Sequence, residues 1–431
     1  MEEKKRRRGK GYTTGLRSAL VELVLNGGAV TYRSLRLLSR SDRHYFEELI
    51  RDMAKDDVFE ISTSKRLKYA TIKDLHKLEL LTSQYGRNGS WKSCGLNEEL
   101  LTRWKEKKKE DGEEIGRYKD LKKKDKNRYR VETNTAAIRK YKEAEVSQIM
   151  WHLKFNSLLT QKPSIARATT PALLDMNAGY YYTFEEVRKN SNYRVETDEQ
   201  IMMDEQIMNS RAIGSLFCSG GSYVIYHFGR ELQMWNKFQE NIYKMATRRV
   251  AKEKMGMYLE ADRNKHPIDG AIILGYQEGI LSKLLNPAAK TDVTHQSKIM
   301  DSEYQNIFYV PVDRNGYYQL SIYKRKDWME EMKKHLIPYG FDTTPSKLGK
   351  AAHGKGVEDG INKVVYLFTN NNVKELLFFI DRAAASPKTS YQIVAWRYMA
   401  GLFEFDVELP ENIEMKYIDI EDYIKKVGIN G

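Results

Sequence analysis

Three residues in the C-terminal half have the types that a metal-dependent nuclease of the restriction-enzyme kind uses. Asp269 stands directly before an apolar run at 271–274 that predicts a buried strand. Glu414-Met415-Lys416 forms an acid-x-Lys pattern on another predicted strand. In such an enzyme the acidic residues ligate Mg²⁺ and the group positions a water for attack. The sequence therefore admits a nuclease with Asp269, Glu414 and Lys416 as catalytic residues and Mg²⁺ as cofactor.

Spacing and composition weigh against this chemistry. About 145 residues separate Asp269 from Glu414, and acid-x-Lys recurs by chance in a chain of which 30% is charged. The segment His353-Gly354-Lys355-Gly356 lacks the spacing of a phosphate-binding P-loop and is expected to be a flexible loop. The eight histidines form no His-x-His pair. We therefore expect no resident metal or cofactor, and the sequence favours a binding protein over an enzyme.

Residues 16–72 carry the clearest structural pattern. Apolar side chains at helical spacing predict helices at 16–25 and 31–38, and a third helix that Ser41 begins. Alternating residues at 58–61 and 67–72 predict a hairpin. Three helices followed by a hairpin predict a winged helix-turn-helix, in which the third helix enters the major groove of DNA.

The expected DNA contacts lie on the third helix and its approach, on the hairpin or wing, and on a basic N-terminal arm. They are Arg40, Arg43, His44 and Arg51, then Lys65, Arg66 and Lys68, and finally Arg6, Arg7 and Arg8. Glu47, Glu48 and Asp52 on the third helix would repel phosphate. Because winged helices also serve as protein-interaction modules, a scaffold without DNA affinity remains an alternative.

The net charge of +13 is concentrated near the N-terminus. Residues 1–72 hold 16 lysines and arginines against 10 acidic residues, and residues 103–130 hold 13 against 7. Little net charge remains for the rest of the chain. A surface that binds a polyanion is therefore expected in the N-terminal third.

The chain divides into three predicted parts: an arm and winged helix at 1–72, a charged helical connector at 73–156, and an α/β (or α+β) body with a mixed sheet at 178–431, with a subdomain division near 300 as one option. The connector ends in a predicted helix at 133–155. In the body, strands are predicted at 179–184, 211–218, 222–227, 271–274, 363–369, 392–398 and 415–418. Helices are predicted at 185–189, 230–254, 278–285, 326–336 and 373–384.

Two details of the body are specific enough to test. Asn315-Gly316 predicts a hairpin that joins strands at 307–312 and 317–323. The helix at 230–254 is expected to bury Phe238, Ile242 and Met245, together with Leu232 and Trp235.

The expected cellular location follows from features that the sequence lacks. No apolar run approaches the ~20 residues that a membrane span needs. The basic N-terminus has no apolar segment behind it, so no secretory signal is expected. Cys94 and Cys218 are expected to be reduced thiols, which suits a cytoplasmic protein.

A family resemblance adds to these patterns. The winged-helix pattern, the charged connector and the α/β body together resemble the replication-relaxation proteins of Gram-positive plasmids and integrative conjugative elements. The runs Tyr182–Arg188, Ser210–Gly214 and Gly221–Tyr226 with Trp235 look like a segment found in uncharacterised proteins of such elements. The resemblance covers under a third of the chain. It implies DNA processing, such as origin recognition or relaxase recruitment, and supplies no catalytic residue.

The leading hypothesis is therefore a DNA-binding protein of a mobile genetic element, acting in plasmid replication, conjugative mobilisation or their regulation. Its expected partners are double-stranded DNA, a relaxase or replication protein, and a second copy of the chain. The alternatives are a nuclease targeted by the winged helix and a protein-interaction scaffold.

Overall fold

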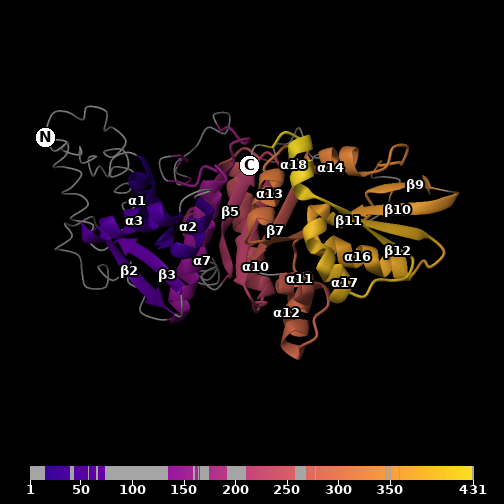
Figure 1. Ribbon diagram of the computed structural model, residues 1–431, viewed down its shortest axis with the longest axis horizontal. Helices are drawn as coiled ribbons and strands as arrows, with labels where there is room; N and C mark the ends of the chain where they lie inside the picture. The colour runs from indigo at the N-terminus through magenta and orange to yellow at the C-terminus, as the bar shows by residue number, and fades with distance from the viewer. Residues whose placement is uncertain are drawn as a thin grey trace, which may run out of the picture. The chain divides into compact units, whose positions relative to one another are not determined.

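The computed structural model describes residues 15–38, 43–56, 58–64, 67–72, 134–158, 161–163, 165, 174–191, 210–257, 268–276, 278–344, 348, 351–358 and 360–429. The chain forms two compact units, residues 1–167 and 168–431. Helices and several sheets mix in the chain, as the α/β prediction requires (Figure 1).

The first unit opens with three helices and a small sheet. Its elements are α1 (Gly15–Gly27), β1 (Val30–Thr31), α2 (Tyr32–Leu38), α3 (Arg43–Lys55), β2 (Phe59–Ser64) and β3 (Leu67–Ile72). The strands are antiparallel, in the order β1-β3-β2. Leu20, Val24, Leu35, Ile50 and Met53 are buried together in its core. The three predicted helices and the hairpin are thus confirmed.

A further helix, α7 (Asn134–His152), packs against α1, α2 and β1 of the same unit. Buried polar groups fix it there. Gln148 Oε1 accepts from the backbone N–H of Thr31 at 2.8 Å, and Glu145 accepts from Ser34 Oγ at 3.2 Å. The predicted connector at 73–156 therefore ends in a helix that belongs to the first unit. Residues 73–133 lie outside the described residues.

The second unit contains two sheets. The first has the order β4-β5-β6-β7-β8, and the second has the order β12-β11-β10-β9. Their strands are β4 (Tyr180–Thr183), β5 (Ala212–Cys218), β6 (Gly221–Gly229), β7 (Ile268–Gly275), β8 (Asn306–Pro311), β9 (Gly354–Glu358), β10 (Ile361–Leu367), β11 (Ser390–Trp396) and β12 (Ile413–Ile418).

The two sheets share one plan. A hairpin, β5–β6 or β9–β10, is followed by two parallel strands added in chain order. The sheets divide between β8 and β9, and not near residue 300. The segment from Gly354, predicted as a flexible loop, is strand β9.

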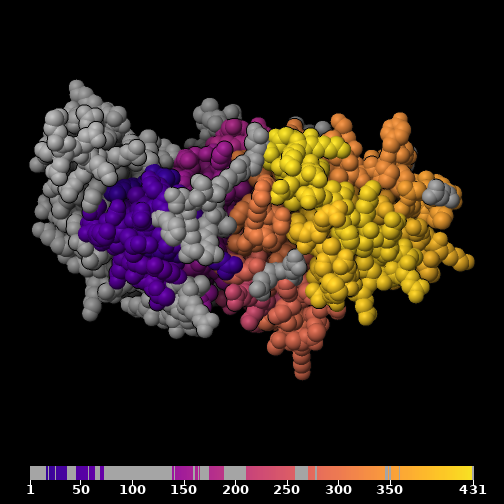
Figure 2. All heavy atoms as spheres, in the orientation of Figure 1, coloured from indigo at the N-terminus to yellow at the C-terminus, as the bar shows by residue number. Residues whose placement is uncertain are grey.

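Helices connect the strands and cover them. They are α8 (Phe184–Ser191), α10 (Lys237–Glu253), α11 (Glu278–Leu285), α12 (Lys290–Met300), α13 (Arg314–Tyr323), α14 (Trp328–Leu336), α16 (Val373–Ala384), α17 (Ala400–Phe405) and α18 (Ile420–Lys426), with 3-10 turns η5 (Phe368–Asn370) and η6 (Arg397–Met399). In Figure 2 the yellow atoms of the C-terminal segments pack directly against the orange atoms of the segments before them.

The hairpin predicted at Asn315-Gly316 is wrong. Residues 314–323 form helix α13, because Asp313 caps its N-terminus by accepting from the backbone N–H of Gly316 at 3.0 Å. A glycine is needed at position 316 because the backbone of Pro311 lies very close, and not because the chain turns there. A Cβ added there would lie 1.7 Å from the carbonyl oxygen of Pro311.

The inward face predicted for the helix at 230–254 is also wrong. Leu232 and Trp235 are buried, but they precede α10. Phe238 and Met245 are 59% and 60% exposed. The helix is rotated because Glu240 is buried, where it accepts from Ser210 Oγ at 2.6 Å and from Tyr226 Oη at 2.9 Å.

Two helical glycines give a matched test of packing. Gly316→Ala should destabilise the protein by about 2–3 kcal/mol, because the new methyl group meets backbone atoms. Gly279→Ala in α11 meets nothing within 4 Å and should stabilise the protein by about 0.5–1 kcal/mol. Urea unfolding of the two variants measures both, and equal effects would contradict the close approach at Gly316.

Candidate functional site

The structure describes the side chains of two of the ten predicted DNA contacts, Arg51 and Lys68. Arg43 and His44 lie in α3, but their side chains are outside the described part of the chain. Outside it altogether are Arg6, Arg7, Arg8, Arg40, Lys65 and Arg66.

Arg51 and Lys68 are exposed cations on different elements of the first unit. Lys68 of β3 places its Nζ 4.2 Å from the ring centroid of Tyr32, at the start of α2. Burial and the charge of Glu47 raise the pKa of Tyr32, and the charge of Arg51 acts in the opposite sense. The side chain of Arg51 is half exposed. Helix α3 and the hairpin thus each present one cation.

Two of the acidic residues of α3, Glu47 and Asp52, have cationic neighbours. Glu47 lies 3.6 Å from Arg51, and Asp52 lies 3.3 Å from Lys55 and 3.9 Å from Arg17. Their charges are therefore partly compensated within the unit. This weakens the objection that Glu47 and Asp52 would repel phosphate.

The nuclease candidates are not brought together on neighbouring strands. Asp269 lies in β7, in register with Ser222 of β6, and its side chain is outside the described part of the chain. Glu414 and Lys416 lie in β12 of the other sheet. Glu414 instead accepts from Lys363 Nζ of β10 at 2.8 Å. The arrangement of one acid next to an acid-x-Lys strand is therefore not formed.

The described residues form neither a metal-binding cluster nor a membrane-spanning helix. Among the described residues, no group of three or more His, Cys, Asp and Glu side chains could hold a metal ion. None of the described helices is long and apolar enough to cross a membrane.

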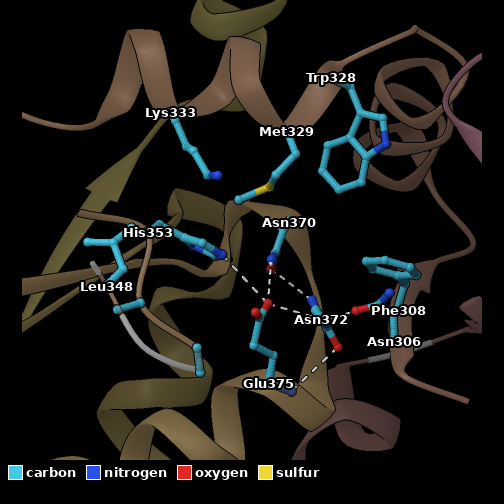
Figure 3. Close-up of a pocket in the computed structure, with 12 residues that line it drawn as sticks. Asn306, Phe308, Trp328, Met329, Lys333, Leu348, His353, Asn370, Asn372 and Glu375 are labelled. Atoms are coloured by element: carbon cyan, nitrogen blue, oxygen red, sulfur yellow. Dashed lines mark hydrogen bonds and ion pairs between the residues drawn. The ribbon is translucent and has the colours of Figure 1, made fainter. Parts of the chain in front are cut away.

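The second unit holds a cavity of about 260 Å³ between its two sheets (Figure 3). It is lined by the start of β8, helix α14, residue 348 with residues 351–353, and the turn that leads into α16. The lining residues are Asn306, Phe308, Trp328, Met329, Lys333, Leu348, Ala351, Ala352, His353, Asn370, Asn372 and Glu375.

The carboxylate of Glu375 lines this cavity and accepts hydrogen bonds from several of its neighbours. Its Oε2 accepts from Asn370 Nδ2 and Asn372 Nδ2, each at 3.2 Å, and from Tyr366 Oη at 3.4 Å. Burial alone would raise the pKa of Glu375, but hydrogen bonds from His353, Asn370 and Tyr366 outweigh it and hold the pKa below its ordinary value. Glu375 is therefore ionised at neutral pH.

His353 supports Glu375 rather than acting as a free base. Its Nδ1 accepts from the backbone N–H of Leu367 at 2.9 Å, so the ring proton lies on Nε2. Nε2 lies 3.7 Å from Glu375 Oε2, and the ring stacks on Tyr366. Both ring nitrogens of His353 thus face groups of the fold.

Three consecutive asparagines form the turn that precedes Glu375, and the first and third of them line the cavity. Asn372 caps α16 and donates through Nδ2 to Asn306 Oδ1 at 2.9 Å, across to β8. Asn371 has a φ of 57° and donates to the carbonyl oxygen of Tyr309 at 2.9 Å. These residues therefore join the turn after β10 to the edge strand of the other sheet.

The sequence patterns do not single out this site, although they predict the strand and the helix that flank it. They place His353 only in a glycine-rich loop. The available signal is the run Asn370-Asn371-Asn372 between a predicted strand and a predicted helix, because ligand sites in parallel sheets lie at such strand ends.

Comparison of the chain with known protein families, with curated proteins and with solved structures found no match. Function is therefore inferred from the geometry of the protein itself.

Glu375 should make stability depend on pH. Its pKa is lower in the folded than in the unfolded chain, so its stabilisation is present above about pH 4.3 and is lost as pH falls through the lower folded value. At pH 7 the wild type should exceed Glu375→Gln by about 1–3 kcal/mol in free energy of unfolding.

Urea unfolding between neutral and acid pH measures this difference, which should shrink as the solution becomes acidic. Glu411→Gln, at an exposed position, serves as the control. A difference that stays constant over the range would show that ionisation of Glu375 is not the cause.

Proposed function

We propose that the first unit is a winged helix-turn-helix that binds duplex DNA. Its element order α1-β1-α2-α3-β2-β3 and its antiparallel sheet support this reading. In that fold α3 would be the recognition helix, and the β2–β3 hairpin would be the wing.

The observation that carries the proposal is that the recognition helix and the wing each carry an exposed cation, Arg51 and Lys68 respectively. Two such charges on adjacent elements suit the closely spaced phosphates at the edge of a groove. The ion pair of Asp52 with Lys55 reduces the repulsion that this carboxylate would otherwise cause.

The wider role follows from the resemblance to replication-relaxation proteins. We infer that the protein acts in replication, mobilisation or its regulation on a mobile element, with the second unit available to a relaxase or replication protein. Binding rather than cleavage is proposed, because Asp269 and Glu414 lie in different sheets.

Replacing both cations should weaken DNA binding. Arg51→Ala with Lys68→Ala should lower affinity for a mixed-sequence duplex at least about tenfold. It should also reduce the slope of log K against log salt by roughly 2, because two phosphates would no longer be neutralised. Fluorescence anisotropy at several salt concentrations measures both quantities.

Lys252→Ala with Lys388→Ala is the matched control, since it removes the same charge from exposed positions of the second unit. It should leave affinity and salt slope close to those of the wild type. Equal decreases in the two double variants would point to net charge alone. Absence of salt-dependent binding by the wild type would favour the protein-interaction scaffold.

A further inference from the structure

The cavity in the second unit presents one unused acceptor. All hydrogen bonds to the Glu375 carboxylate from described residues end on Oε2, as does the contact with His353. No described residue donates to Oε1 (Figure 3). The side chain is 28% exposed, and Glu375 lines the cavity. An ionised carboxylate oxygen is thus open to a ligand.

The neighbouring amides hold that oxygen in place but do not compete for it. Asn372 uses its Nδ2 for Asn306 and for Glu375 Oε2. Its Oδ1 accepts from the backbone N–H groups of Ile307 and Glu375. Asn370 Oδ1 likewise accepts from the backbone N–H of Asn372 at 2.9 Å. The position of Oε1 is therefore fixed by a network that is already complete without a ligand.

The other walls set the size and character of the ligand. At about 260 Å³ the cavity has room for on the order of nine water molecules at ~30 Å³ each, or for a ligand of similar bulk. Phe308, Trp328 and Met329 line the cavity, and Met329 is the partly exposed one of the three. Phe308 and Trp328 are buried behind it, and Trp328 donates its Nε1–H to Tyr223 at 3.3 Å.

The charged side chains that line the cavity favour a cationic ligand. Lys333 is the basic residue that reaches toward the cavity in Figure 3, and its Nζ is paired with Glu330 at 2.7 Å. Glu375 contacts His353, whose ring is neutral because Nδ1 accepts a hydrogen bond. Among the described lining residues, Glu375 is therefore the charged group without an ionic partner, and its charge is negative.

We propose that this cavity binds a small primary amine, with its ammonium group on Glu375 Oε1 and its apolar body against Met329. A primary ammonium is a compact donor that one oxygen can satisfy. A guanidinium fork needs two acceptor oxygens, and Oε2 is already occupied. The cavity should thus distinguish an amine from a guanidine of equal charge and similar bulk.

Calorimetric titration of the full chain with four related probes tests the proposal. The wild type should bind 2-phenylethylamine saturably, and it should bind 2-phenylethanol, 3-phenylpropionate and benzylguanidine at least about tenfold more weakly. Equal binding of the alcohol would overturn the role of charge. No saturable binding of the amine up to about 10 mM, already weak for a small ligand, would overturn the site.

Variants assign the binding to Glu375. Glu375→Gln can keep an acceptor toward Asn370 and Asn372 while turning an amide N–H group toward the ligand, and its amine affinity should fall at least about tenfold. Glu411→Gln removes the same charge at an exposed position and should bind as the wild type does.

Met329→Trp provides a second route that leaves the Glu375 network intact. Met329 points into the cavity (Figure 3), so the larger side chain should weaken amine binding by a similar factor. If circular dichroism shows that Glu375→Gln is not folded, the amine affinity of Met329→Trp tests whether the amine binds in this cavity. Unchanged amine affinity in Met329→Trp, or in folded Glu375→Gln, would overturn the assignment.

Discussion

The second unit depends on the backbone of Asn370–Asn372, which follows a strand of one sheet and forms hydrogen bonds with a strand of the other. The backbone N–H of Tyr309 donates to the carbonyl oxygen of Asn371 at 3.0 Å, and Phe308 pairs with Asn372 in an isolated bridge. Asn371 adopts a left-handed conformation there, which asparagine tolerates better than most residues. Because β8 and the turn into α16 form adjoining sides of the cavity, the junction that joins the sheets also builds the site around Glu375 (Figure 3).

Much of the secondary structure could be predicted from the sequence, because it follows from local periodicity and capping. The helices at 278–285 and 373–384 have the predicted bounds, and the hairpin at residues 211–227 is present. The wrong prediction of a hairpin at Asp313–Gly316 also arises from local sequence signals. Asn315-Gly316 favours a turn, whereas Asp313 caps a helix, and the cap prevails since Gly316 must pass close to Pro311.

The remaining features depend on buried polar contacts between residues far apart in the chain. Gln148 positions α7 on Thr31, Glu240 rotates α10 toward Ser210, and Glu375 gathers His353 and two asparagines. A hydrophobic pattern carries no information about such partners. It cannot show that Phe238 faces solvent, or that Glu375 forms part of a site. The candidate cavity therefore could not be predicted from the sequence, whereas the strand and the helix that flank it could.

The docking of α7 brings a distant stretch of the chain into the core of the first unit. Helix α7 packs on α1, α2 and β1, and its Gln148 and Glu145 accept hydrogen bonds from Thr31 and Ser34. A chain truncated after residue 72 would leave Thr31 and Ser34 without their buried partners, so this unit cannot be transplanted as a short N-terminal fragment.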